Sequence, residues 1–196
     1  MSQNRSSLLQ RAFALEWTTL AWNVVGSTIL IASAWRARSV ALAGFGLDSV
    51  VEIGASTVVL WELGGSSEAR TQRALRLIAG AFLLLALYLV IQGVVALASH
   101  HHAQHSHLGI LWTALTACVM FALARAKAVV GRALSNPAVV AEGRVTFIDG
   151  VLASSVLVGL VLNALLNWWW ADSAAGFVIV YYALREFRAV TAQVTR

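Results

Sequence analysis

Six apolar stretches, each about the length that crosses the hydrocarbon core of a membrane, dominate this sequence. They cover residues 12–34, 39–61, 74–98, 108–130, 145–166 and 168–187. With 59% hydrophobic and only 12% charged residues, the chain has too little polar sequence to coat such helices with a water-facing surface or to build a second domain. The sequence therefore predicts an all-α membrane protein with six transmembrane helices in a single domain spanning 1–196, without a soluble C-terminal domain.

The basic residues are divided unevenly between the two ends of these helices. If the N-terminus is cytoplasmic, Arg36 and Arg38 fall on the outer side and the other twelve of the 14 Lys and Arg residues on the inner side. Short cytoplasmic loops are enriched in Lys and Arg, so both termini are predicted to be cytoplasmic. The basic residues form no stripe, so the net charge of +5 does not indicate a nucleic-acid partner. We expect a bacterial-type plasma (inner) membrane.

Three acidic residues fall inside these apolar stretches. Asp48 and Glu52 are four apart in the second stretch, which puts them one above the other on one helical face, and Asp149 lies near the start of the fifth. A charge at the centre of a membrane helix costs about 2.5 to 3.5 kcal/mol. The acids could be solvated near the cytoplasmic face or paired with a basic residue, but Lys127 and Arg144 are expected to extend to the membrane surface. A cation bound by the three carboxylates is the better account.

Other polar residues share the faces of these acids. Glu16 and Asn23 are seven apart in the first stretch, and Glu142 is seven before Asp149 with Thr146 between them. They are candidates for completing the cation site or for an access path to it. The alternative is that Asn23 forms an interhelical hydrogen bond and that Glu16 and Glu142 are interfacial.

The chain's histidines are concentrated between the third and fourth stretches. They are His100, His101, His102, His105 and His107. On the predicted topology this loop is outside, where neutral imidazoles could bind released metal, or where the loop is simply solvated. Asp172, just after a tryptophan triplet, is expected to be an outer-surface cap of the last helix.

Three stretches, 39–56, 146–158 and 170–176, resemble the membrane domain of the cation diffusion facilitator family. The resemblance implies a metal-ion/proton antiporter, usually dimeric, that expels Zn²⁺ or a similar divalent ion from the cytoplasm. The fifth helix of the family usually carries a His or Asp four residues before the second acid, whereas this chain has Val145. The family commonly has a soluble metal-binding domain as well, which is not expected in this chain. In this organisation the chain is similar to the vesicular six-span zinc transporters of the transmembrane-163 type.

The identity of the ion depends on two opposed arguments. Carboxylates alone suit hard cations, whereas Zn²⁺ sites more often include His or Cys. The resemblance favours Zn²⁺, with Mn²⁺, Fe²⁺ and Co²⁺ as the other ions. A proton-coupled exporter of small organic cations is the alternative function, and a membrane scaffold is a third. No cofactor is expected. The chain is not expected to be an enzyme, because the sequence does not place a nucleophile, a base and an orienting group at a common depth.

Overall fold

The computed structural model describes residues 2–63, 68–100, 102–134 and 137–194, and all regular structure in these ranges is helical. The helices are α1 (Ser2–Ala37), α2 (Val40–Leu63), α3 (Glu68–Ala98), α4 (His107–Leu134), α5 (Pro137–Leu166) and α6 (Trp169–Val194). Each predicted span lies within one helix to within one residue. The described residues do not include His101. They also do not include the side chains of several helix residues, among them Glu142 and Arg144.

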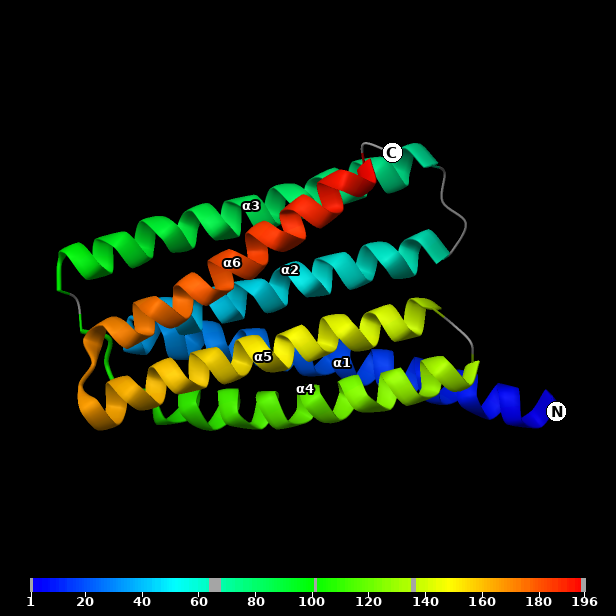
Figure 1. The fold of residues 1–196 in the computed structure, drawn as a ribbon, viewed down its shortest axis with the longest axis horizontal. Coiled ribbons are helices and arrows are strands. Elements are labelled where there is room, and N and C mark those ends of the chain that lie inside the picture. Colours follow the sequence, from blue (N-terminus) through cyan, green and yellow to red (C-terminus); the bar gives the residue numbers. More distant parts are fainter. Residues whose placement is uncertain (1, 64–67, 101, 135–136, 195–196) are drawn as a thin grey trace.

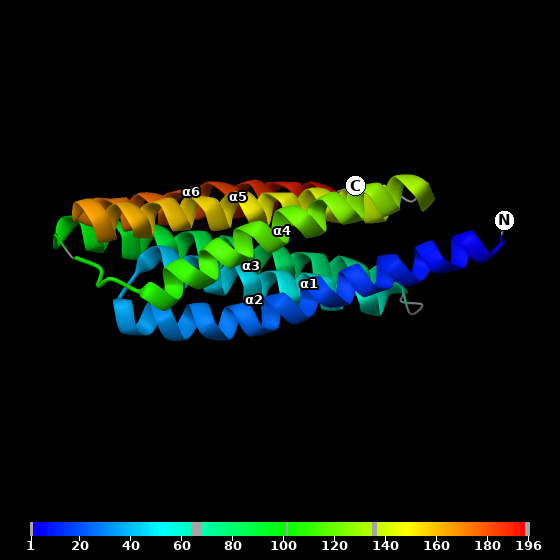
Figure 2. The ribbon, with the colours of Figure 1, turned by 90° about the horizontal axis from the view of Figure 1, so that it is seen from below.

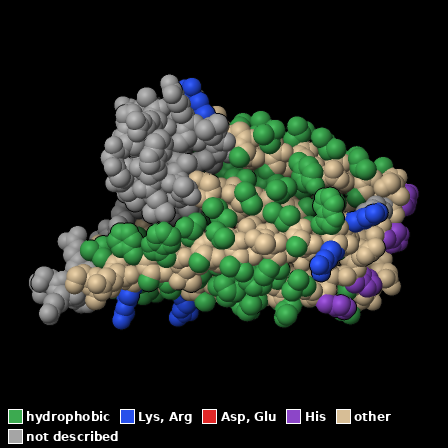
Figure 3. Space-filling model, turned by 180° about the vertical axis from the view of Figure 1, so that it is seen from behind, with side chains coloured by type: hydrophobic (Ala, Val, Ile, Leu, Met, Phe, Trp, Pro, Cys, Tyr) green, Lys and Arg blue, Asp and Glu red, His purple; other side chains and the backbone are tan. Residues whose placement is uncertain are grey.

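Three helices are long and apolar enough to cross a membrane over their described residues. The stretches are Ala79–Ala98 in α3, His107–Ala133 in α4 and Val145–Leu166 in α5. Large aliphatic side chains such as Leu84 and Leu111 are exposed on the outside of the bundle. Figure 3 shows hydrophobic side chains over the middle of one face, with Lys, Arg and His toward its ends. A surface of this kind suits contact with lipid, as in a membrane protein.

The helices run alternately up and down, and both ends of the chain lie at the same end of the bundle (Figure 1). α3 and α6 pack along each other, as do α4 and α5, while α1 packs on both α2 and α4. α2 contacts α1, α3, α5 and α6, so it is the central helix. The first turns of α1 extend past the rest of the bundle (Figure 2).

Two tight turns close the end of the bundle opposite the termini. Arg38, between α1 and α2, has a φ of 51°, and Asn167, between α5 and α6, has a φ of 52°. Both are in the left-handed region, which reverses the chain within two residues and which Asn tolerates better than most residues. Ser39 then starts α2, because its Oγ accepts a hydrogen bond from the Leu42 amide at 3.1 Å, as an N-cap serine does.

Candidate metal centre

The depth of Asp48 in the bundle follows from the packing of α2 on α6. Gly44 faces both α3 and α6, since a Cβ at that position would lie 2.8 Å from the Cδ2 of Leu89 and 3.1 Å from the Cδ1 of Ile179. α2 and α6 run in the same direction, so four residues further along each chain Asp48 reaches the level of Ala183. Both residues are buried. Asp48 therefore lies inside the bundle.

The packing of α5 on α6 brings Asp149 to the same level. A Cβ on Gly159 would lie 2.7 Å from the Cβ of Ala175, and α5 runs opposite to α6. Eight residues along each helix, Ala183 is level with residue 151, about 3 Å along the axis from Asp149. Asp48 and Asp149 are each only 6% exposed. Two predicted ligands from distant parts of the sequence thus reach one depth of the interior.

The surroundings of Asp48 are acidic. Its carboxylate interacts electrostatically with Glu52, one helical turn away, and with Glu186 of α6. The sequence argument missed Glu186. The sequence could have indicated Glu186, because it is an acidic residue one position before the end of the sixth apolar stretch. It lies three residues beyond Ala183 on the same helix.

Asn23 of α1 contacts the second predicted ligand. Its Nδ2 donates a hydrogen bond to Oε2 of Glu52 at 3.2 Å, and the Asn23 side chain is buried. The inward orientation predicted for Asn23 is confirmed, and so is its interhelical hydrogen bond. The amide therefore helps to orient the carboxylate of Glu52.

Glu16 and Lys127 form an ion pair between α1 and α4. The Nζ of Lys127 lies 2.8 Å from Oε2 of Glu16, with the lysine side chain 0% and the glutamate side chain 35% exposed. The prediction that Lys127 extends to the membrane surface is therefore wrong, because a carboxylate from another helix compensates its charge inside the bundle. The second oxygen of Glu16, Oε1, is buried without a hydrogen-bond partner among the described residues.

On α5, the inward position next to Asp149 belongs to Thr146. Its side chain is 1% exposed and lies three residues before Asp149, on the same face of the helix. Val145, where the resembled family carries a ligand, is 44% exposed and faces away from the core. Thr146 can offer a hydroxyl oxygen to the interior, whereas the side chain of Glu142 lies outside the described residues.

Asp172 does not occupy the exposed position that was predicted for it. It is 2% exposed, and its Oδ1 accepts a hydrogen bond from Ser39 Oγ at 2.5 Å. Its Oδ2 accepts from the amides of Val40 at 2.8 Å and Ala41 at 3.4 Å. Asp172 therefore caps the N-terminus of α2 from the first turn of α6, where the helix dipole favours a negative charge.

The described histidines of the loop between α3 and α4 are exposed. His100 and His102 lie against the ring of Trp169, at centroid distances of 5.1 and 5.8 Å. The loop itself is held to the bundle, since Asn163 donates to the Ala103 carbonyl at 2.9 Å and the Gln104 amide to the Ala37 carbonyl at 2.8 Å. Across the described part of the chain, no three His, Cys, Asp or Glu side chains are grouped closely enough to hold one ion.

No family model and no curated protein matches the chain. The likeness to cation diffusion facilitators therefore stays a prediction from the three sequence stretches.

The interior offers oxygen ligands of several kinds. Asp48, Glu52 and Asp149 supply carboxylates, Thr146 a hydroxyl, and Glu186 a further carboxylate on a third helix. Such donors bind hard divalent cations directly and bind protons in their absence. In the described residues the acids are not grouped closely enough to hold one ion, so these donors would have to converge before a metal ion could be exchanged for protons.

Proposed function

We propose that the chain is a divalent metal cation transporter, a metal/proton antiporter that exports Zn²⁺ from the cytoplasm through a site of Asp48, Glu52 and Asp149. The observation that carries this proposal is the burial of Asp48 and Asp149 at one level of the bundle, on different helices. A buried carboxylate binds a cation or a proton readily, because either one reduces the cost of its burial. Exchange of one for the other is the transport reaction.

The acidic surroundings of Asp48 support a divalent ion as the partner of these carboxylates. Asp48 has Glu52 and Glu186 as its electrostatic neighbours, both of them acids. A doubly charged ion reduces the repulsion between these acids more than one proton does, and protons that enter from the far side restore the neutral state when the ion leaves.

The proposal includes the predicted topology. Six spans with cytoplasmic termini would open the acids alternately to the two sides of a plasma membrane of bacterial type, and two copies would form a dimer.

The test is transport in proteoliposomes that contain a metal-sensitive dye and a pH-sensitive dye. Zn²⁺ uptake should be accompanied by proton movement in the opposite direction, and Asp48→Asn and Asp149→Asn should each abolish both signals. Asp172→Asn is the matched control, since it neutralises a buried acid that holds α2 rather than the site. It should retain at least half of the transport per folded protein. Undiminished exchange in Asp48→Asn would refute the proposal.

The same vesicles separate the metal from an organic cation. Zn²⁺, Mn²⁺, Fe²⁺ and Co²⁺ are compared at equal concentration, and a lipophilic quaternary ammonium ion is added as competitor. A metal transporter keeps its metal flux when the organic cation is present. Proton movement driven by the organic cation and not by any metal would establish the alternative exporter.

A further inference from the structure

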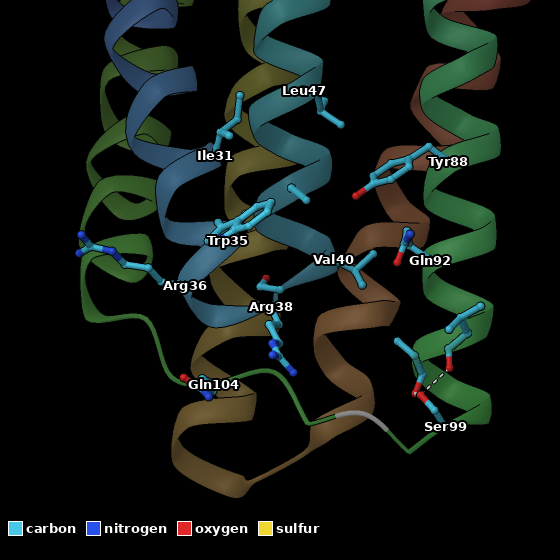
Figure 4. Close-up of a pocket in the computed structure, with 15 residues that line it drawn as sticks. Ile31, Trp35, Arg36, Arg38, Val40, Leu47, Tyr88, Gln92, Ser99 and Gln104 are labelled. Carbon is cyan, nitrogen blue, oxygen red and sulfur yellow. Dashed lines mark hydrogen bonds between the residues drawn. The ribbon is translucent and has the colours of Figure 1, made fainter.

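A cavity of about 900 Å³ lies at the end of the bundle opposite the termini, between the α1–α2 turn and α3 (Figure 4). It is distinct from the acidic interior, because Asp48, Glu52 and Asp149 are not part of its wall. Trp35, which is 87% exposed, stands at its rim, and Tyr88 and Val95 on α3 are exposed as well. The cavity is therefore open to the surroundings of the bundle.

The wall of this cavity changes from apolar to polar along its length. Ile31 of α1 and Leu47 of α2 line the part that lies farther from the loop (Figure 4). Toward the loop the lining includes Gln92, Ser99 and Gln104. From Val40 to Leu47 the apolar wall of α2 extends about 10 Å. The cavity thus combines a hydrophobic channel with a polar mouth at the level where the helices end.

Arg38 supplies the positive charge of the mouth. Its side chain extends into the space between the α1–α2 turn and the Ser99–Gln104 segment (Figure 4). Its backbone has a φ of 51°, a conformation that is unfavourable for a residue with a Cβ. Ser39 is bonded to Asp172, and the Gln104 amide to Ala37, so the turn is held on both sides.

We propose that this cavity binds one anionic phospholipid, with its phosphate at Arg38 and an acyl chain along the apolar wall between α2 and α3. A guanidinium group binds a phosphate through two parallel hydrogen bonds. Tyr88 and Gln92, four residues apart on α3, point toward the cavity and add a hydroxyl and an amide (Figure 4). A free phosphate ion would leave the apolar wall without a partner, whereas a phospholipid matches both the charge and the channel.

Native mass spectrometry of the detergent-purified protein, titrated with phosphatidylglycerol or phosphatidylcholine, tests this proposal. We expect one phosphatidylglycerol per chain, and about tenfold weaker binding in Arg38→Ala. Arg36→Ala is the matched control, because Arg36 borders the cavity two residues away but its side chain points to the other side of α1 (Figure 4). Its affinity should equal that of the unchanged protein.

A second variant tests the apolar wall without altering the charge. Ala43→Phe places a ring in the channel from α2 and should prevent lipid binding while Arg38 stays in place. Inorganic phosphate at millimolar concentration should not displace the lipid. The proposal would be overturned if the protein bound the two phospholipids with equal affinity, or if Arg36→Ala and Arg38→Ala lost equal affinity. Purified protein that binds no phosphatidylglycerol, as monomer or dimer, would also overturn it.

Discussion

The Nζ of Lys127 lies 2.8 Å from Oε2 of Glu16, in a contact that joins residues 111 positions apart in the sequence. Glu16 is 21 residues before the end of α1, so the pair lies about 30 Å from the α1–α2 turn, close to the thickness of a hydrocarbon core. The ion pair therefore joins α4 to α1 in the half of the bundle that lies toward the termini.

The two partners of this ion pair should not be equally important for stability. Glu16→Gln removes the negative charge that lies 2.8 Å from the fully buried ammonium group of Lys127, which we expect to lower the free energy of unfolding by about 2 kcal/mol. Lys127→Met removes the buried charge and retains most of the aliphatic volume, and it leaves a carboxylate that is partly accessible, so the loss should be below about 1 kcal/mol. Unfolding in mixed detergent micelles, followed by circular dichroism, measures both.

The double variant is the control for this prediction. If the effect of Glu16→Gln arises from the lost attraction to the ammonium group of Lys127, the same substitution should have little effect in a Lys127→Met background. Equal losses in both backgrounds, or a larger loss in Lys127→Met than in Glu16→Gln, would contradict the assignment.

The sequence predicted the helices well because a helix that crosses a bilayer needs a fixed apolar length. It also predicted that Asn23 faces inward, since residues seven apart share a helical face. It did not predict the partners of Lys127 and Asp172. These partners lie on helices distant in the sequence, and helical periodicity gives the face of each helix but not its neighbour. Glu186 was missed for a related reason, because a charge near the end of a span is usually interfacial.

Asp172 should contribute to stability through the N-terminus of α2. Asp172→Ala removes the acceptor of the Ser39 hydroxyl and of the Val40 amide, both in a buried position. We expect a loss of about 2 to 3 kcal/mol in the free energy of unfolding, since buried donors would be left unpaired. Asp172→Asn keeps one acceptor oxygen and should lose about half as much. Thermal unfolding of the two variants in micelles gives the comparison, and an exposed helix cap would show less than about 1 kcal/mol in either.

Asn23 should act on the affinity for the ion rather than on the turnover, provided that the proposed transport is correct. Asn23→Leu removes the amide that donates to Oε2 of Glu52 at 3.2 Å, so the carboxylate loses a contact that orients it. Loss of such a supporting contact typically weakens metal binding about 10- to 100-fold, and we expect at least a tenfold rise in KM for the metal with kcat within about twofold. Initial rates in proteoliposomes over a range of metal concentrations separate the two constants.

Asn163→Leu is the matched control for Asn23, because Asn163 donates to the Ala103 carbonyl in the loop and is remote from the acids. Its KM should be unchanged. A fall in kcat without a change in KM in Asn23→Leu would show that the hydrogen bond to Glu52 does not support ion binding.

The close approach of α5 to α6, which sets the depth of Asp149, depends on Gly159. A Cβ there would lie 2.9 Å from the backbone oxygen of Ala171, and a helix backbone cannot move aside as a side chain can. We expect Gly159→Ala to lower the free energy of unfolding by about 1 to 3 kcal/mol. Gly54→Ala is the control, because a Cβ there meets no described atom within 4 Å, and it should be neutral or stabilising by up to about 1 kcal/mol through helix propensity. Equal effects of the two substitutions in chemical unfolding would show that α5 and α6 do not need to approach this closely.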